Sequence, residues 1–194
     1  VSGIAGARLL YIALNIPFFM QHPKEIIMIH HGGLAILGGF LSSIVSMYVF
    51  TKKKKLSFLK IADMVVPFAA LAQAIGRIGC FFNGCCYGMP SRYGFYFPVH
   101  NAVLIPTQLI SSFLLLVLYV VLRIQESRAH SAGSIFAAYI MLYSALRFFV
   151  EFIRFDSPKS FFGLTIFQLF CIVFFIAGIV FVFRLKWKKK SLPR

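Results

Sequence analysis

Six apolar stretches of this chain are each about as long as a membrane is thick. They run over Val1–Phe19, Gly32–Phe50, Ile61–Phe82, Val103–Leu122, Gly133–Ile153 and Gly163–Phe183. A helix needs about 20 mostly apolar residues to cross the hydrocarbon core of a bilayer. In lipid, a spanning segment must satisfy all its backbone hydrogen bonds internally. The sequence therefore predicts an all-α fold, a polytopic transmembrane helix bundle of about six spanning helices.

The composition excludes a soluble protein of this size. Hydrophobic residues make up 60% of the chain and charged residues only 13%, whereas soluble domains have about a quarter of their residues charged. We expect one integral membrane domain over residues 1–194. The sequence begins at Val1, already inside an apolar stretch, so we expect a further N-terminal helix to precede it in the full-length protein.

The basic residues predict the orientation of the bundle. The net charge is +15, but the basic runs are short and lie between apolar stretches, which argues against nucleic-acid binding and for contact with membrane lipids. If six segments alternate, Lys52–Lys55, Arg123, Arg128 and the basic tail from Arg184 onward all fall on one side. Positive loops stay in the cytoplasm, so we expect a cytoplasmic C-terminus.

The loop after the third apolar stretch is the longest one on the opposite, outer side. It runs over Asn83–Ala102, is rich in Gly, Pro and Tyr, and has too few consecutive apolar residues to cross the membrane. We expect it to form a short cap on the outer face or a re-entrant arm.

Three arginines, Arg8, Arg77 and Arg147, lie inside the apolar stretches. An arginine at the centre of a spanning helix costs roughly 2.5–3.5 kcal/mol on insertion scales, so each needs a partner or a polar cavity. A structural ion pair and a side chain that snorkels to the interface are the alternatives to a functional role.

The fifth apolar stretch carries a polar stripe. Tyr143, Arg147 and Glu151 follow at spacings of four, and Arg154 comes three residues later, which places all four on one helix face. We predict that this face points into the bundle, on the same side as Arg77. One carboxylate cannot neutralise the arginines gathered there, and the planar guanidinium fork suits phosphate oxygens, so an anionic lipid headgroup is the expected ligand.

Two further stretches carry groups capable of chemistry. His31 precedes two glycines at the start of the second apolar stretch and is a candidate base, because histidine changes its charge near neutral pH; an interfacial polar residue is the alternative. Gly76–Gly88 contains Arg77, Asn83, Gly84 and three cysteines, and we expect its glycines to break the helix. The cysteine spacing matches no zinc pattern, so we interpret these thiols mainly as packing residues, with a disulfide, a metal ion and a nucleophile as alternatives.

These motifs resemble those of a known family, the prolipoprotein diacylglyceryl transferases of the bacterial inner membrane. The similarity extends over nearly the whole chain, in six elements in the same order: Gly6-Ala7-Arg8-Leu9-Leu10-Tyr11; His31-Gly32-Gly33-Leu34; Gly76-Arg77-Ile78-Gly79 with Phe81, Asn83 and Gly84; Pro106-Thr107-Gln108-Leu109; the stripe Tyr143, Arg147, Glu151, Arg154; and Gly163-Leu164-Thr165 with Gln168.

The resemblance implies a transferase that moves a diacylglyceryl group from phosphatidylglycerol to the lipobox cysteine of a prolipoprotein signal peptide, with no metal and no organic cofactor. It implies catalytic roles for His31, Arg77 and Arg147. It implies substrate-binding roles for a larger set, which comprises Arg8, Tyr11, Asn83, Gly84, Tyr143, Glu151 and Arg154. The implied location is the bacterial cytoplasmic (inner) membrane, with the active site toward the outer leaflet. The oligomeric state is not indicated.

Several positions depart from the family pattern. Cys80 stands where the family usually has Asn, Cys85 where it has Glu, Ile105 where it has His, and Ile110-Ser111 where it has Tyr-Glu. These departures leave other functions open. A lipid-binding paralogue with another acceptor would keep the arginines, a membrane thiol oxidoreductase would cycle Cys80, Cys85 and Cys86, and a transporter would need a path through the inner half, where Asp63 is the ionisable residue.

Overall fold

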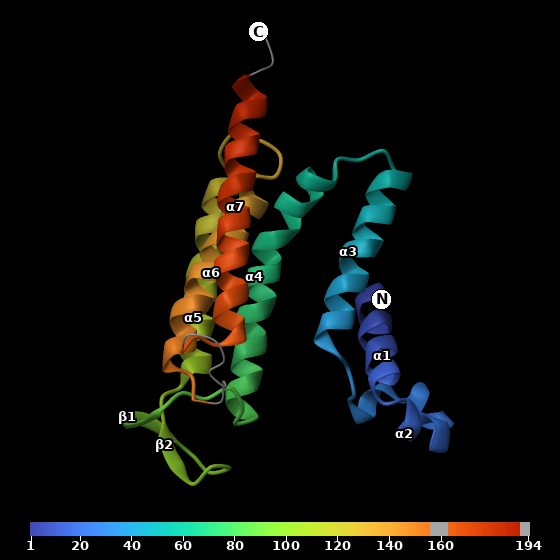
Figure 1. Ribbon diagram of the computed structural model, residues 1–194, viewed down its shortest axis with the longest axis vertical. Helices are drawn as coiled ribbons and strands as arrows, with labels where there is room; N and C mark the ends of the chain where they lie inside the picture. Colours follow the sequence, from blue (N-terminus) through green and yellow to red (C-terminus); the bar gives the residue numbers. More distant parts are fainter. Residues whose placement is uncertain (156–162, 191–194) are drawn as a thin grey trace. The chain divides into compact units, whose positions relative to one another are not determined.

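The computed structural model describes residues 1–155 and 163–190 of the chain, in two compact units, Val1–Phe58 and Leu59–Arg194. The helices are α1 (Ser2–Leu14), α2 (Ile16–Gln21), α3 (Ile36–Lys53), α4 (Phe58–Phe82), α5 (Thr107–Glu126), α6 (Ser134–Ile153) and α7 (Ile166–Lys190). Two short 3-10 helices, η1 (Pro23–Ile26) and η2 (Ile29–His31), precede α3, and two strands, β1 (Pro90–Phe97) and β2 (Ala102–Leu104), lie between α4 and α5. Figure 1 shows their arrangement within each unit.

The first unit is a close pair of helices. Small residues let α1 and α3 approach each other, as is common between membrane helices. A Cβ atom added at Gly38 would lie 2.4 Å from the carbonyl oxygen of Gly6, and one added at Gly6 would lie 2.1 Å from Oγ of Ser42. Both distances are far below van der Waals contact, so no larger side chain fits at this crossing.

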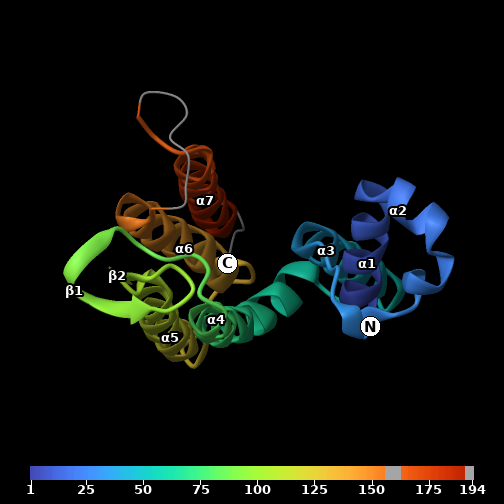
Figure 2. The same ribbon diagram turned by 90° about the horizontal axis from the view of Figure 1, so that it is seen from below.

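The second unit is a bundle of α4, α5, α6 and α7, seen end-on in Figure 2. Its core is apolar and comes from one face of each of three helices, with Val66, Ala70 and Ala74 from α4, Leu115, Leu118 and Leu122 from α5, and Ile135 from α6. Buried polar bonds join the same helices. Oγ of Ser112 donates to the carbonyl of Ala74 at 2.9 Å, and Nε2 of Gln73 donates to the hydroxyl of Tyr139 at 2.8 Å.

Asp63, the acidic residue expected in the inner half of the membrane, caps a neighbouring helix. Its carboxylate accepts hydrogen bonds from the backbone amides of Gly133, at 2.6 Å, and Phe136, at 2.8 Å, which are the N-cap and the third residue of α6. The side chain is almost fully buried. Asp63 therefore satisfies a helix N-terminus, where a negative charge is favoured, and this structural role accounts for its place in the membrane.

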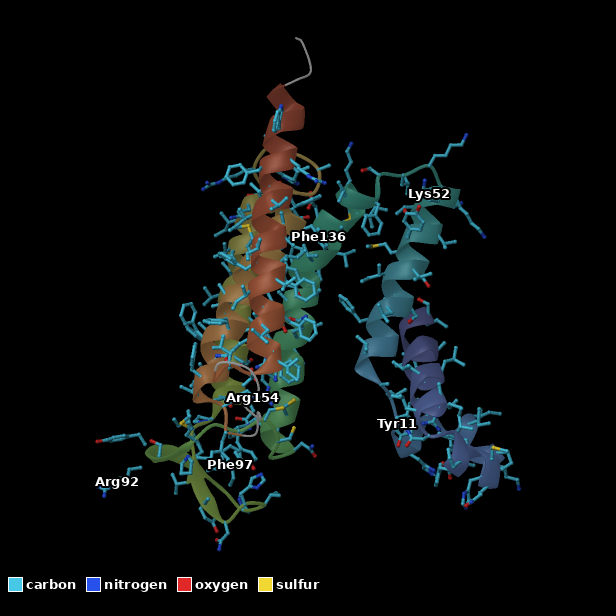
Figure 3. The ribbon with its side chains drawn as sticks, in the orientation of Figure 1. Tyr11, Lys52, Arg92, Phe97, Phe136 and Arg154 are labelled. Atoms are coloured by element: carbon cyan, nitrogen blue, oxygen red, sulfur yellow. The ribbon has the colours of Figure 1, made fainter. Side chains whose placement is uncertain are left out.

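The loop expected on the outer face forms a small antiparallel hairpin of β1 and β2. Backbone bonds tie it to the bundle, since the amide of Met89 donates to the carbonyl of Ile153 and the amide of Gly88 to that of Ile105. Phe81 packs edge-on against Phe97 of β1. In Figure 3, Phe97 and Arg154 lie at this end of the second unit and Phe136 lies toward the other. The predicted cap is thus a pair of strands in an otherwise helical fold.

The all-α membrane bundle is confirmed, but the number of spans is lower than predicted. Among the described residues, four helices are long and apolar enough to cross, namely α4, α5, α6 and the Ile166–Leu185 part of α7. The first predicted span is interrupted at Asn15, next to Pro17, which leaves α1 with 13 residues, or about 20 Å at 1.5 Å per residue. The second begins at Ile36 and includes two terminal lysines in its 18 residues. Both apolar lengths fall short of the bilayer core of about 30 Å.

The predicted helix break around Arg77 is wrong. Helix α4 continues through Gly76 and Gly79 and ends at Phe82, and the first glycine with a left-handed backbone in this stretch is Gly84, with φ +67°. A glycine inside a helix costs only about 1 kcal/mol. An open hydrogen-bond ladder in lipid costs several kcal/mol for each unsatisfied group, so the helix persists.

Candidate functional site

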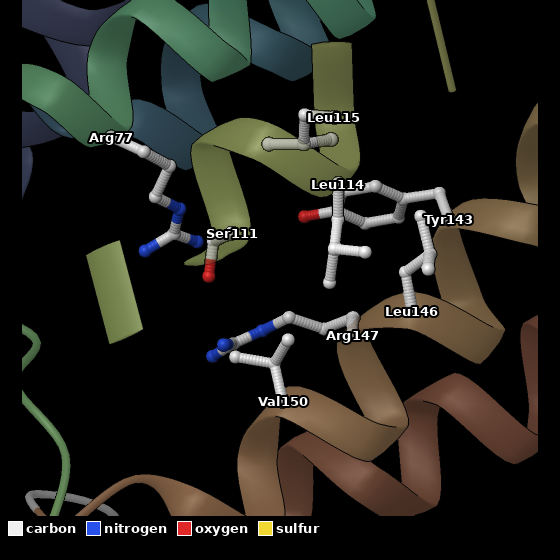
Figure 4. A pocket seen from close by; sticks show the side chains of 8 residues that line it. All are labelled: Arg77, Ser111, Leu114, Leu115, Tyr143, Leu146, Arg147 and Val150. Carbon is white, nitrogen blue, oxygen red and sulfur yellow. The ribbon is translucent and has the colours of Figure 1, made fainter. Parts of the chain in front are cut away.

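Two arginines from different helices face one pocket in the second unit. Its walls come from α4, α5 and α6, and the lining residues are Arg77, Ser111, Leu114, Leu115, Tyr143, Leu146, Arg147 and Val150. Figure 4 shows the guanidinium groups of Arg77 and Arg147 and the hydroxyl of Ser111 directed into the same space. The prediction that Tyr143 and Arg147 share an interior face with Arg77 is confirmed.

The two arginines differ in what holds them. Nη2 of Arg147 lies 2.8 Å from Oε2 of Glu151, and its guanidinium also lies over the ring of Phe167. Arg77 makes no hydrogen bond or ion pair with any residue in the described part of the chain. Its positive charge is close enough to Arg147 for the two to repel each other. An anion between the two guanidinium groups would relieve that repulsion.

Glu151 is the acidic centre of the polar stripe. Its side chain is fully buried, and Nη1 of Arg154 lies 3.9 Å from the same oxygen that binds Arg147. Thr165 donates its hydroxyl to the other oxygen, Oε1, at 3.2 Å. Glu151, Arg154 and Thr165 also line a second cavity beside the first residues of α7. One carboxylate thus serves two arginines, and the net charge around it is positive.

The start of α7 is fixed by a reciprocal cap. The amide of Gln168 donates to Oγ1 of Thr165 at 3.2 Å, and the amide of Thr165 donates to Oε1 of Gln168 at 2.9 Å. This is the Thr-x-x-Gln form of the capping box. The residues expected to begin the last helix do so, and the cap holds the threonine that contacts Glu151.

Three cysteines, one in the last turn of α4 and two in the loop that follows it, meet at the end of that helix. The sulfur atoms of Cys80, Cys85 and Cys86 all lie within 4.8 Å of one another, and each residue is partly exposed. Cys86 has φ +62°, a left-handed conformation that costs roughly 1–2 kcal/mol for a residue with a side chain. The sequence placed the three cysteines in one short stretch, but their spacing matched no zinc pattern, because it does not show the left-handed turn that brings the sulfur atoms together.

Two buried side chains at the start of α5 hold the cysteine turn in place. Oγ1 of Thr107 donates to the carbonyl of Cys86 at 2.6 Å, and Nε2 of Gln108 donates to the carbonyl of Cys85 at 2.7 Å. Both side chains are 1% exposed. The resemblance included Thr107 and Gln108 without assigning them a role, and the structure shows that they position the loop.

Asn83 and Gly84 lie between the arginine helix and the cysteine turn. Asn83 is exposed just beyond α4, and Gly84 is buried with a left-handed backbone. The carbonyl oxygen of Gly84 lies 2.8 Å from Nε2 of His100, and the His100 ring packs against Tyr87. Asn83 thus exposes an amide side chain at the same end of the bundle as the arginine pocket.

In the first unit, His31 lies within hydrogen-bond distance of a carboxylate that sequence reasoning missed. Nδ1 of His31 lies 3.0 Å from Oε2 of Glu25, and both side chains are partly exposed to the surroundings. A carboxylate bound to one ring nitrogen orients the imidazole. The only advance signal was an acidic residue six positions before the histidine.

Arg8 organises the loop that carries this pair. Its guanidinium donates to the carbonyls of Gly32 at 2.6 Å and Gly33 at 2.9 Å, to that of Ile26 at 3.2 Å, to that of Met28 at 3.3 Å, and to that of Glu25. A Cβ atom at Gly33 would lie 2.7 Å from this guanidinium and 2.5 Å from the ring of Tyr11. Arg8 therefore acts on protein carbonyls here, and Tyr11 packs against the glycine turn.

Comparison with known proteins identifies similar chains over nearly the full length. A family model described as "Prolipoprotein diacylglyceryl transferase" matches residues 1–184. The phosphatidylglycerol–prolipoprotein diacylglyceryl transferase of Clostridium tetani is 36% identical over 198 residues, which cover 98% of this chain and 79% of that protein. The protein of the same name from Finegoldia magna is 39% identical over 193 residues, covering 97% and 75%. That from Thermosynechococcus vestitus is 35% identical over 206 residues, covering 100% and 76%.

Proposed function

The chain belongs to the prolipoprotein diacylglyceryl transferase family, and we propose that it moves a diacylglyceryl group from phosphatidylglycerol to the lipobox cysteine of a prolipoprotein, the first step of lipoprotein maturation. Its relatives carry that activity in their names. The observation on this chain that best supports the proposal is the arginine pocket, where Arg77 and Arg147 face one space and a single carboxylate serves the stripe.

The pocket has the charge that a phosphodiester ligand requires. Arg147 is already paired with Glu151, while Arg77 has no described partner. Ser111 lines the pocket at a position where the family pattern has Glu, which leaves the surplus of positive charge larger. Guanidinium groups hold phosphate oxygens in pairs, so the headgroup phosphate of phosphatidylglycerol fits between the two arginines.

The proposed reaction is a displacement at carbon. The thiolate sulfur of the acceptor attacks the glyceryl carbon next to the phosphate, a C–S bond forms and the C–O bond breaks. The electron pair stays on the oxygen of the departing glycerol phosphate. Negative charge therefore grows on the leaving group, and Arg77 and Arg147 would stabilise it in the transition state. Tyr143 lines the same pocket and is the proposed donor that orients the headgroup.

His31 is the proposed base for the acceptor thiol. The support for this role is the contact of its Nδ1 with Oε2 of Glu25 at 3.0 Å, which orients the ring. Arg8 and Tyr11 would act on the substrate through this loop, as positioning residues for it. Asn83 and Gly84 at the end of α4, and Glu151 with Arg154 at the second cavity, complete the proposed substrate-binding set.

We place the protein in the bacterial cytoplasmic membrane as a single integral domain over residues 1–194, with its C-terminus in the cytoplasm and its active site toward the outer leaflet. The support is the distribution of basic residues. Lys188–Lys190 close α7 at one end of the second unit, and the hairpin marks the other end (Figure 1). The arginine pocket is built from the residues nearer the hairpin end of α4, α5 and α6.

The test is a transfer assay with the full chain in vesicles that contain phosphatidylglycerol labelled in its acyl chains. A synthetic signal peptide with a lipobox cysteine is the acceptor, and the same peptide with serine is the control. We expect label on the cysteine peptide only, and one glycerol phosphate released for each peptide modified. A folded protein that leaves the peptide unmodified, or that converts it to a disulfide, would contradict the proposal and favour the lipid-binding or the oxidoreductase alternative.

A further inference from the structure

The cysteine cluster has a geometry that its sequence spacing does not predict. Three sulfur atoms lie within 4.8 Å of one another at the end of α4. Three thiolates around a tetrahedral Zn²⁺, each about 2.3 Å from the ion, would be about 3.8 Å apart. A contraction of at most about 1 Å between the sulfur atoms would therefore close them on the ion. The partial exposure of all three side chains leaves a path for entry.

The backbone around the cysteine cluster is held by hydrogen bonds from two buried side chains to which the proposed function gives no other role. Thr107 and Gln108, both buried, bind the carbonyls of Cys86 and Cys85, and the amide of Cys85 donates to the carbonyl of Cys80 at 3.1 Å. Cys86 keeps a left-handed conformation that few residues other than glycine adopt. A strained residue with supporting bonds on both sides is typical of a functional position, whereas simple packing would not require it.

The charge around the cluster suits a metal ion bound by thiolates. Zn²⁺ with three thiolates has a net charge of about −1. Arg77 stands one helical turn before Cys80 on α4, where its positive charge would offset that negative charge and favour the thiolate form. In the described part of the chain, the cluster contains three possible ligands and no histidine or carboxylate as a fourth. Three protein ligands and one open position are typical of catalytic zinc sites.

We propose that Cys80, Cys85 and Cys86 bind one Zn²⁺ ion whose fourth position accepts the thiol of the incoming lipoprotein cysteine; the second half of this inference rests on the proposed function. The acceptor thiol gives its proton to the base of the proposed function as its sulfur binds the ion. The bound thiolate then attacks the glyceryl carbon of the lipid held beside Arg77, forming the C–S bond as the C–O bond to glycerol phosphate breaks. Zn²⁺ does not change its oxidation state.

The expected increase in transfer rate follows from the ionisation of the acceptor thiol. A free cysteine with a pKa of about 8.5 is only about 3% thiolate at pH 7, whereas a thiol bound to Zn²⁺ is deprotonated outright. The ion can therefore raise the reactive fraction of the acceptor by roughly 30-fold at that pH. Without the ion, the rate should climb with pH toward 8.5. With it, the rate should change little over the same range.

The first experiment measures metal binding alone, without lipid transfer. The full chain is purified in detergent, its zinc content is measured, and Co²⁺ is titrated as a spectroscopic substitute. Cys80→Ser and Cys85→Ser are compared with Cys171→Ser, which removes a buried thiol of α7 that is outside the cluster. We expect one Co²⁺ per chain, with a sulfur-to-cobalt charge-transfer band, in the wild type and in Cys171→Ser. The two cluster variants should lose at least about tenfold in affinity. Equal binding by all four proteins, or no binding by the wild type, would overturn the site.

The second experiment tests the open position. The lipobox cysteine peptide should change the Co²⁺ spectrum of the wild type, and the serine peptide should not; identical spectra with both peptides would overturn the role in acceptor binding.

In the transfer assay, Cys80→Ser should lose roughly 10- to 30-fold in rate at pH 7 and recover part of it toward pH 8.5. Full transfer by a variant that binds no metal would overturn the inference and leave the proposed function standing. A wild type that binds Co²⁺ but transfers no lipid would overturn the proposed function and leave the metal site standing.

Discussion

Replacing Arg77 by alanine or lysine tests whether this side chain holds a phosphate. Arg77 makes no hydrogen bond or ion pair in the described part of the chain, so its removal leaves no buried group unpaired. We therefore expect the free energy of unfolding to change by less than about 1 kcal/mol. The activity should respond very differently, because the pocket would lose a guanidinium that no carboxylate in residues 1–155 or 163–190 neutralises.

The magnitude follows from the loss of one charge-assisted contact in the transition state. Such a contact contributes roughly 3–4 kcal/mol, by analogy with oxyanion-hole donors, so Arg77→Ala should lower the rate of transfer by about 100- to 1,000-fold. Arg77→Lys should recover little of this loss, since lysine keeps the charge but has no planar fork for two phosphate oxygens. The assay is transfer of labelled diacylglyceryl to the lipobox peptide in vesicles, with thermal unfolding measured in parallel.

Arg92→Lys is the matched control, because Arg92 is an exposed arginine on β1 and does not line the pocket. It should transfer lipid at the wild-type rate. Near-normal transfer by Arg77→Lys would refute the bidentate contact and leave Arg77 as a positional charge. A large loss of stability in Arg77→Ala would refute the reasoning from its missing protein partners.

Three further substitutions separate structural from chemical roles. Glu151→Ala should destabilise the protein by about 3–5 kcal/mol in denaturant unfolding, because it leaves the mostly buried Arg147 without its ion-pair partner; a change below about 1 kcal/mol would contradict this. Asp63→Ala should lower the thermal unfolding midpoint at unchanged specific activity of the folded protein, since two amide donors of α6 lose their acceptor, at roughly 1–3 kcal/mol each; a selective loss of transfer would instead indicate a chemical role. His31→Ala should slow transfer by about 100- to 10,000-fold with little change in stability, while His22→Ala, an exposed histidine of the same unit, should transfer normally.

The polar stripe of α6 could be predicted because its geometry is local. Residues four apart on a helix must share a face, and the cost of a charge in lipid decides which way that face points. The structure accordingly places Tyr143 and Arg147 in one pocket and buries Glu151. The apolar stretches predicted α4 to α7 for the same reason, since length and composition alone decide whether a helix can span.

The features that were missed have three separate causes, and only one of them involves a segment far away in the sequence. The first apolar stretch contains enough hydrophobic residues to span, yet Asn15 ends α1 early. The cysteine cluster requires a left-handed turn at Cys86, and the bond that holds this turn comes from Thr107 on another helix. The partner of His31 comes from a 3-10 helix. None of these contacts has a fixed sequence spacing, so no pattern could have predicted them.

Three arginines with the same insertion cost have three different fates, and the difference indicates which one is available for a ligand. Arg8 is saturated by backbone carbonyls within its own unit, and Arg147 is paired with Glu151. Arg77 lines the pocket without a described partner. An anion gains most from a charge that is not already neutralised, since breaking an existing ion pair would offset the new contact. Substitution of Arg8 should therefore cost mainly stability, that of Arg147 both stability and rate, and that of Arg77 mainly rate.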